Sequence, residues 1–297
     1  MKIYLLKYWK PIAAVGFWGI SFVATKIALE ELLPLQIIFL RLIIGSALLL
    51  VIFLSLKKDM TLPRDSFTGI IILALIAVFH LWIQVTGLQY TSATNTGWLV
   101  GTTPVFMAVM GYLFYKEKLN LINVSGIFIA FAGLVLLISR GNIFNINFIS
   151  NRGDLLVLVS AFTWSIYSMM NKKISHSYSP MLTVFYLFVF MGIIIAPFTI
   201  DGVFFNTLLK LSWQVWASVL FLGLFCSGLA YVFWSQSLRD LEAAKTGAFL
   251  YLEPFVTVVT AWIILEENIT LLILLSGVII TAGVIMVNLK KPSRLFQ

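Results

Sequence analysis

The feature that most constrains this chain is a succession of apolar stretches, each about 20 residues long, separated by short polar segments. An α-helix rises 1.5 Å per residue, so about 20 apolar residues cross the roughly 30 Å hydrocarbon core of a bilayer. The sequence lacks the ten-residue segments of alternating polarity that build a transmembrane barrel. It therefore predicts an all-α integral membrane protein.

Proline, glycine and charged residues divide the chain into ten candidate membrane-spanning helices. Only 11% of the residues are charged, against about 25% in a soluble domain. The connections between the spans are short, so no soluble domain fits between them. The predicted spans cover residues 11–30, 34–56, 66–90, 93–115, 121–139, 153–172, 180–200, 213–238, 243–265 and 269–289.

The basic residues fall mainly on one side of these spans. If the N-terminus is cytoplasmic, 15 of the 20 lysines and arginines lie inside and three lie outside, while Lys26 and Arg41 fall within spans. Cytoplasmic segments of membrane proteins carry such an excess of Lys and Arg, so both termini are predicted to be cytoplasmic. The net charge of +8 then faces anionic lipid, and nucleic acid is not an expected partner.

The two halves of the chain resemble each other. At an offset of 146 residues the coinciding pairs include Trp18 with Trp164, Lys26 with Lys172 and Pro34 with Pro180. At an offset of 150 they include Ala93 with Ala243, Pro104 with Pro254 and Glu117 with Glu267. These pairs indicate an internal repeat.

The predicted repeats have five spans each, and five is an odd number, so the second repeat enters the membrane from the opposite side. The first repeat is expected over 1–139 and the second over 153–289, with an inter-repeat loop at 140–152 and a basic cytoplasmic tail at 290–297. Inverted repeats around a midplane site are the structural basis of alternating access in transporters.

Three motifs carry a family resemblance. The segments WGISFVATKIALEELLPLQIIFLRLIIG and GLQYTSATNTGWLVGTTPVFMAVMGYLFYKEKL, and LEAAKTGAFLYLEPFVTVVTAWIILEENIT in the second half, resemble the EamA-type branch of the drug/metabolite transporter superfamily. The resemblance implies a central cavity lined mainly by spans 1, 3, 4, 6, 8 and 9, and export of small metabolites such as amino acids. The chain departs from the pattern at Leu187, which occupies the place of Arg41 in the second repeat, and at Ser276, where a glycine is expected.

Polar and aromatic side chains recur at helical spacing within the spans, which places them on common helix faces. Indoles and phenols would supply contact and cation–π surface, while hydroxyls and amides would orient a substrate. The alternative is helix packing mediated by small and polar residues. The candidate substrate-binding residues are Trp18, Ser21, His80, Gln84, Trp98, Thr102, Trp164, Ser168, Tyr231, Trp234 and Tyr251.

Glu253 is the sharpest single candidate, because it lies about 15 Å into the ninth span, close to the predicted midplane. A carboxylate there could bind a substrate ammonium group or carry a coupling proton. The structural alternative is an ion pair with Arg41 or Lys26.

Three other ionisable residues inside spans have open roles. His80 could carry a proton, contact the substrate or be a neutral core residue, since imidazole ionises near neutral pH. Arg41 and Lys26 could bind a substrate carboxylate or phosphate. Alternatively, they could form structural ion pairs, and for Lys26 the candidate partner is Glu30.

The sequence narrows the function classes. One cysteine and two histidines cannot build a zinc, haem or iron–sulfur centre from several such ligands, so neither metal nor cofactor is expected. No GxxxxGK[ST] motif is present, which excludes direct ATP hydrolysis by this chain. The sequence favours a secondary transporter, with a sugar-phosphate or nucleotide-sugar exchanger as the first alternative and an intramembrane lipid-modifying enzyme as a remote one.

The expected partners follow from that class. They are a small-molecule substrate, the lipid bilayer and protons as the candidate coupling ion. Gly126 and Gly133 are interpreted as packing positions within the bundle, so the chain is expected to be a monomer or a weak homodimer. Short loops and cytoplasmic termini suit a multi-pass protein of the bacterial cytoplasmic membrane.

Overall fold

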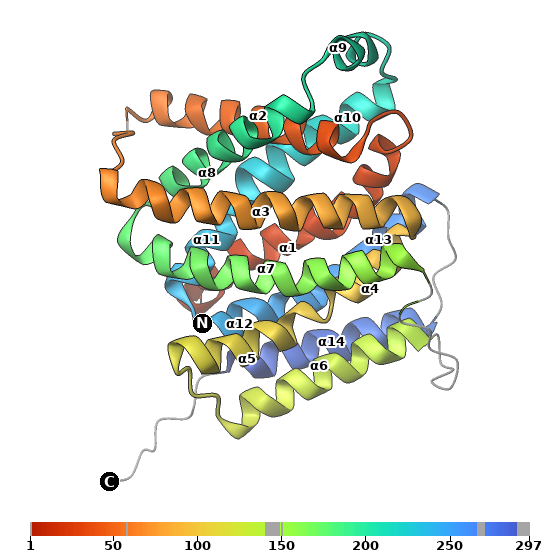
Figure 1. The fold of residues 1–297 in the computed structure, drawn as a ribbon. Helices are drawn as coiled ribbons and strands as arrows, with labels where there is room; N and C mark the ends of the chain where they lie inside the picture. The colour runs from red at the N-terminus through yellow and green to blue at the C-terminus, as the bar shows by residue number, and fades with distance from the viewer. Residues whose placement is uncertain (1, 58, 140–148, 150, 266–270, 290–297) are drawn as a thin grey trace.

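The computed structural model describes residues 2–57, 59–139, 149, 151–265 and 271–289, and all regular elements in these ranges are helical. The long helices lie side by side in one direction, and the short α9 lies apart from the bundle (Figure 1). The predicted purely helical fold is therefore confirmed. Most of the predicted inter-repeat loop, Glu267 and the predicted tail at 290–297 lie outside the described residues.

The helices of the first half follow the predicted spans within a few residues, except that α1 begins earlier. They are α1 (Lys2–Ala28), α2 (Pro34–Ser55), α3 (Arg64–Tyr90), α4 (Ala93–Val100), α5 (Thr103–Tyr115) and α6 (Leu121–Ser139).

The second half repeats this order with additional short elements. Its helices are α7 (Arg152–Ser177), α8 (Pro180–Ile195), η2 (Ala196–Phe198), α9 (Gly202–Leu208), α10 (Trp213–Phe221), η3 (Leu222–Leu229), α11 (Ala230–Asp240), α12 (Ala243–Ala248), η4 (Phe249–Tyr251), α13 (Leu252–Leu265) and α14 (Leu271–Asn288).

Eight helical stretches in the described part of the chain are long and apolar enough to cross a membrane. Two shorter apolar helices, Leu121–Leu136 and Leu274–Asn288, occupy the remaining two predicted positions. The count of ten spans and the cytoplasmic location of the termini stay predictions.

Three of the membrane-length stretches are interrupted near their middle. The breaks between α4 and α5 and between α12 and α13 precede Pro104 and Pro254, respectively. Proline has no N–H, so the carbonyl four residues earlier receives no helical hydrogen bond and the helix breaks there. The third interruption is η3, a π-helical segment between α10 and α11, whereas its counterpart α3 is continuous. Such π segments are frequent at functional sites.

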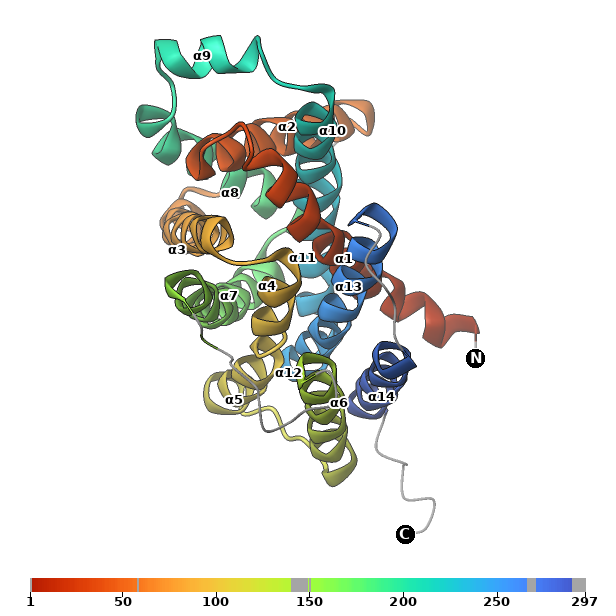
Figure 2. The ribbon, with the colours of Figure 1, turned by 90° about the vertical axis from the view of Figure 1, so that its right-hand side faces the viewer.

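The two halves interlock. Helix α1 packs on α10, α11 and α13, while α7 packs on α3, α4 and α5. Viewed along the bundle, α1 and α13 lie in the middle and α6 and α14 lie together at one edge (Figure 2). A Cβ added at Gly283 on α14 would lie 2.4 Å from the backbone nitrogen of Ala130 on α6, so this pair of helices requires glycine there. Helices of both halves therefore meet in the middle of the bundle.

Candidate functional site

A cavity of about 30 Å³ lies in the centre of the bundle. A water molecule needs roughly 10–15 Å³ measured in this way, so the cavity has room for about two waters. Its walls come from both halves of the chain. The sequence-predicted residues among its lining are Trp18, Ser21, Arg41, His80, Gln84, Trp164, Tyr231 and Glu253.

Aromatic rings form much of the cavity wall. Trp18 and Trp164, which coincide in the sequence repeat, meet edge to face with ring centroids 5.0 Å apart. Tyr231 lies 5.8 Å from Trp18 and 5.6 Å from Trp164, and Tyr167 stacks on Trp164 at 4.8 Å. Edge-to-face and offset-stacked pairs of this kind are the favoured arrangements of aromatic rings. The two halves thus contribute equivalent indoles to one shared wall.

Hydrogen bonds fix the orientation of Trp18 in the cavity wall and of Trp234 behind it. The Trp18 Nε1–H donates to the backbone oxygen of Cys226 in η3 at 2.9 Å. The Trp234 Nε1–H donates to the Ser168 hydroxyl at 3.1 Å. Since buried indole N–H groups need acceptors, the π-helical segment helps to set the position of a cavity-lining ring.

Arg41 reaches the cavity from α2. It is 4% exposed, and its Nε–H donates to the Ser227 hydroxyl in η3 at 2.8 Å. A guanidinium group carries five N–H donors in a planar fork, so this bond leaves the rest of the fork available at the cavity wall.

Glu253 reaches the cavity from α13 and is 3% exposed. Its Oε2 has no hydrogen-bond partner among the described residues. No ion pair joins it to Arg41 or Lys26 in the described part of the chain, so the structural pairing that the sequence left open is not formed. An ionisable group in this environment is costly unless a cation, a proton or water meets it.

His80 lies on α3 and its ring is 4.9 Å from that of Trp164. Its Nδ1 is 3.0 Å from the backbone oxygen of Ser160. A carbonyl oxygen only accepts hydrogen bonds, so Nδ1 carries the hydrogen and, in the neutral ring, Nε2 is an acceptor. His80 thereby links α3 to α7 next to the cavity.

Some predicted site residues do not line the cavity. Trp234 and Ser168 lie behind the wall, and Trp234 contacts Trp18 at 5.3 Å. Thr102 lies in the break between α4 and α5, and its hydroxyl donates to the backbone oxygen of Leu99 in α4. The remaining two are Trp98 and Tyr251, whose Nε1–H and hydroxyl are buried without a hydrogen-bond partner among the described residues.

Apolar residues complete the lining, and the sequence analysis did not identify them. In a chain where every span is apolar, an apolar residue carries no signal that separates a cavity wall from a lipid-facing surface. The one available signal was the repeat, in which Val100 coincides with Leu250, and both residues line the cavity. The additional lining residues are Phe22, Leu81, Val100, Ala161 and Leu250.

Lys26 makes a structural contact. Its Nζ donates to the backbone oxygens of Leu88 and Thr91 at 2.8 and 2.7 Å, at the end of α3. In the second half, Lys172 Nζ donates to the equivalent oxygens of Leu238 and Leu241, at the end of α11. A cation at a helix C-terminus is favourable because it meets the free carbonyls and the negative end of the dipole. The repeat therefore extends from the sequence to matching hydrogen bonds.

Glu117 joins the two halves at one end of the bundle. Its carboxylate accepts hydrogen bonds from the backbone N–H groups of Ala243 and Ala244 at 2.6 and 3.1 Å, at the start of α12. Lys172 Nζ lies 3.5 Å from the same carboxylate. A carboxylate at a helix N-terminus is stabilised by the helix dipole and by charge-assisted hydrogen bonds. The sequence analysis identified Glu117 only as the repeat partner of Glu267.

Asp154 joins the halves at the opposite end. It accepts hydrogen bonds from the Thr91 hydroxyl and the Asn95 amide, both at 2.6 Å. Nearby, the Arg152 guanidinium lies 3.8 Å from the centre of the Tyr90 ring. Polar contacts between the halves thus lie at both ends of the bundle.

Membrane-length helices, two interlocked halves and a polar cavity between them define the class of multi-pass membrane transporters. The model of the EamA-like transporter family matches residues 8–139 and again residues 151–289. The chain belongs to this family, which is part of the drug/metabolite transporter superfamily. The predicted family and the prediction of a transporter rather than an enzyme are confirmed.

Individual relatives support the same assignment. An uncharacterised transporter of Archaeoglobus fulgidus is 31% identical over 279 residues, which cover 92% of this chain and 94% of that protein. The uncharacterised transporter YoaV of Bacillus subtilis is 28% identical over 280 residues, with 93% and 94% covered. A solved crystal structure with 16% identity matches with a TM-score of 0.74 over 95% of this chain and 96% of that one, which supports the fold alone.

Proposed function

We propose that this chain is a secondary carrier that moves small metabolites, such as amino acids or amines, through the central cavity by alternating access. The observation that carries the proposal is the Glu253 carboxylate, which is buried in the cavity wall with one oxygen unpartnered among the described residues. In this proposal Glu253 binds either a substrate ammonium group or a coupling proton, because each would neutralise a charge that is costly at this depth.

The other lining groups complete this binding site. Trp18, Trp164 and Tyr231 supply apolar and cation–π surface for an organic cation or side chain. Ser21 and Gln84 offer hydrogen bonds, His80 contributes a ring that could accept a proton, and Arg41 would meet a carboxylate. Trp98, Thr102, Ser168, Trp234 and Tyr251 would act from outside the lining, by supporting its rings or by joining it when the helices move.

Transport in this proposal requires the halves to separate. A cavity of about 30 Å³ is too small for an amino acid, so the contacts at Glu117 and at Asp154 would open in turn. The proposal includes ten spans in two inverted repeats, 1–139 and 153–289, with both termini in the cytoplasm. It also includes a monomer or weak homodimer in a bacterial cytoplasmic membrane, with export as the direction that the family resemblance favours.

A sugar-phosphate or nucleotide-sugar exchanger is the alternative within this class. Such substrates need several deep cations. Among the described residues, Arg41 is the one lysine or arginine in the cavity lining, and Lys26 is held by backbone oxygens at a helix end. This arrangement favours zwitterionic, cationic or neutral metabolites.

The test is ligand-induced thermal stabilisation of the purified protein across amino acids, amines, nucleosides, sugars and sugar phosphates. A ligand at 100 times its dissociation constant stabilises the folded state by about 2.7 kcal/mol. We expect stabilisation by amino acids or amines, and its loss in Glu253→Gln. The control is Glu242→Gln, since the carboxylate of Glu242 lies outside the cavity lining and pairs with Lys245. Stabilisation confined to sugar phosphates would overturn the proposed substrate class, and stabilisation by amino acids or amines that is unchanged in Glu253→Gln would overturn the ammonium-binding role of Glu253.

A further inference from the structure

An apolar groove runs along the outside of the bundle between α5 and α6. Its volume is about 630 Å³, and Val109, Tyr112, Leu113, Val124 and Phe128 form part of its wall. A second hollow of about 550 Å³ continues along the same helix. Phe128 lines both hollows, and the second is bounded by α6 and by Ile279 of α14. The two hollows therefore meet at Phe128, and we name them together the α5–α6 groove.

The length of the α5–α6 groove follows from the residues of α6 that line it. Val124, Ile127, Phe128, Phe131 and Val135 are spaced so that they share one helix face. Val124 and Val135 are eleven helical steps apart, which corresponds to about 16 Å along the helix axis. This length is close to half of the roughly 30 Å hydrocarbon core, which is the depth of one leaflet.

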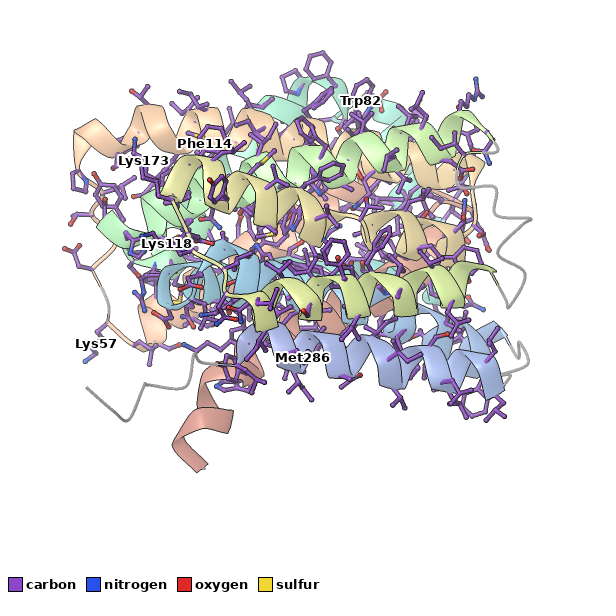
Figure 3. The ribbon with its side chains drawn as sticks, turned by 90° about the horizontal axis from the view of Figure 1, so that it is seen from below. Lys57, Trp82, Phe114, Lys118, Lys173 and Met286 are labelled. Atoms are coloured by element: carbon purple, nitrogen blue, oxygen red, sulfur yellow. The ribbon has the colours of Figure 1, made fainter. Side chains whose placement is uncertain are left out.

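One end of the α5–α6 groove is lined by Lys118 and by the buried Glu117, whose carboxylate is paired with Lys172. Lys118 lines the groove, is exposed, and forms no ion pair among the described residues. Lys118, Lys173 and Lys57 lie at the same end of the bundle (Figure 3), which we name the lysine-rich end. The groove therefore begins at a free cation and continues as an apolar channel one leaflet deep.

We propose that the α5–α6 groove binds one anionic phospholipid, with an acyl chain along α6 and the headgroup phosphate at Lys118. A phospholipid of the adjacent leaflet satisfies the length, the polarity and the charge of the groove together. The proposal does not depend on the transported substrate.

The proposed phosphate position lies beside a contact that closes the bundle. Lys118 directly follows Glu117, whose carboxylate holds the first N–H groups of α12 and the Nζ of Lys172.

The test titrates the delipidated full-length protein in detergent with phosphatidylglycerol and with phosphatidylcholine of the same acyl chains. Native mass spectrometry counts the bound lipids. One basic residue near an anionic lipid contributes enough to change affinity about fivefold. We expect a preference for phosphatidylglycerol that falls about fivefold in Lys118→Ala and is kept in the control Lys57→Ala.

A second pair of variants tests the acyl channel. Ala132 is exposed and lines the groove, so Ala132→Trp fills the channel and should reduce binding of both lipids. The control is Leu75→Trp on α3, a residue that is 52% exposed and outside the groove. Equal binding of the two lipids, or equal loss in Lys118→Ala and Lys57→Ala, would overturn the proposal. A dimer of the parent chain that becomes a monomer in Ala132→Trp would assign the groove to a second copy instead.

Discussion

The two ends of the bundle share one lysine framework but differ in the acid that closes them. Lys26 and Lys172 make equivalent hydrogen bonds to the ends of α3 and α11. At the lysine-rich end, Glu117 bonds to a helix N-terminus and to Lys172. At the opposite end, Asp154 bonds to Thr91 and Asn95 side chains. The lysine contacts therefore follow the repeat symmetry, whereas the acid contacts described at the two ends have different partners.

In the cavity, too, some residues follow the repeat symmetry and others do not. The indoles of Trp18 and Trp164 are a symmetric pair, but the charges are not paired. Glu253 coincides with Thr103 in the sequence repeat, and Arg41 coincides with Leu187. Each charged position thus has a neutral counterpart, and a carrier with two similar halves acquires one distinct binding site.

The largest expected effect is a difference in the free energy of unfolding between the variants Lys172→Met and Lys26→Met. Lys172 is 6% exposed and meets Glu117, so Lys172→Met leaves a buried carboxylate without its cation. Breaking a buried pair in this way costs about 3 kcal/mol. Lys26 contacts only carbonyl oxygens at its helix end among the described residues, and Lys26→Met should cost about 1 kcal/mol. The free energy of unfolding in detergent, measured with a chemical denaturant, compares them. Equal losses would show that Glu117 adds nothing to the lysine framework.

The second prediction concerns the crossing of α1 and α13 next to the cavity. A Cβ at Gly19 would lie 2.6 Å from the Cβ of Val256 and 3.0 Å from the backbone oxygen of Glu253. In the other half, the equivalent Ser165 fits, and its hydroxyl lies 3.4 Å from the backbone oxygen of Thr103. The crossing that carries the carboxylate is therefore the tighter of the two.

Gly19→Ala should lower the free energy of unfolding by about 2 kcal/mol because the crossing must widen. Gly16→Ala is the matched control on the same helix, since a Cβ there meets nothing within 4 Å. That change should be neutral or stabilising by about 0.5–1 kcal/mol, because alanine favours helix. Thermal unfolding of the two variants in one detergent distinguishes them. A Gly19→Ala variant as stable as the parent would mean that α13 can move away from α1 at no cost.

The sequence predicts the helices and the two repeats well, because the length of the apolar stretches, the positions of the charges and the repeated residues can be read directly along the chain. It also identifies Trp18 and Glu253 as candidates, and both line the cavity. Trp98 and Thr102 lie outside the cavity lining, and Thr102 falls in the break between Val100 and Thr103, where regular helical spacing no longer indicates which face a residue shares. The sequence also gives no role to Glu117, whose partners lie 126 and 127 residues away and are identified only by the folded arrangement.

The smallest expected effect tests whether the two ends open independently. Glu117→Gln and Asp154→Asn each remove one charge while keeping a side chain of similar shape. A hydrogen bond to a charged group contributes about 1.5 kcal/mol, so each variant should open its own end about tenfold more often. Ser21→Cys places a thiol in the cavity lining, and the single native Cys226 is fully buried, which gives a low background.

The measurement is the labelling rate of Ser21→Cys in oriented vesicles with a thiol reagent that does not cross membranes. Glu117→Gln should accelerate labelling about tenfold from the lysine-rich side only, and Asp154→Asn from the opposite side only. If either variant accelerated labelling from both sides, opening of the two ends would be coupled. If neither variant changed the rate, helix packing rather than the two acids would hold the ends closed. A one-sided response in both variants would mean that Glu117 and Asp154 decide which side of the membrane the cavity meets.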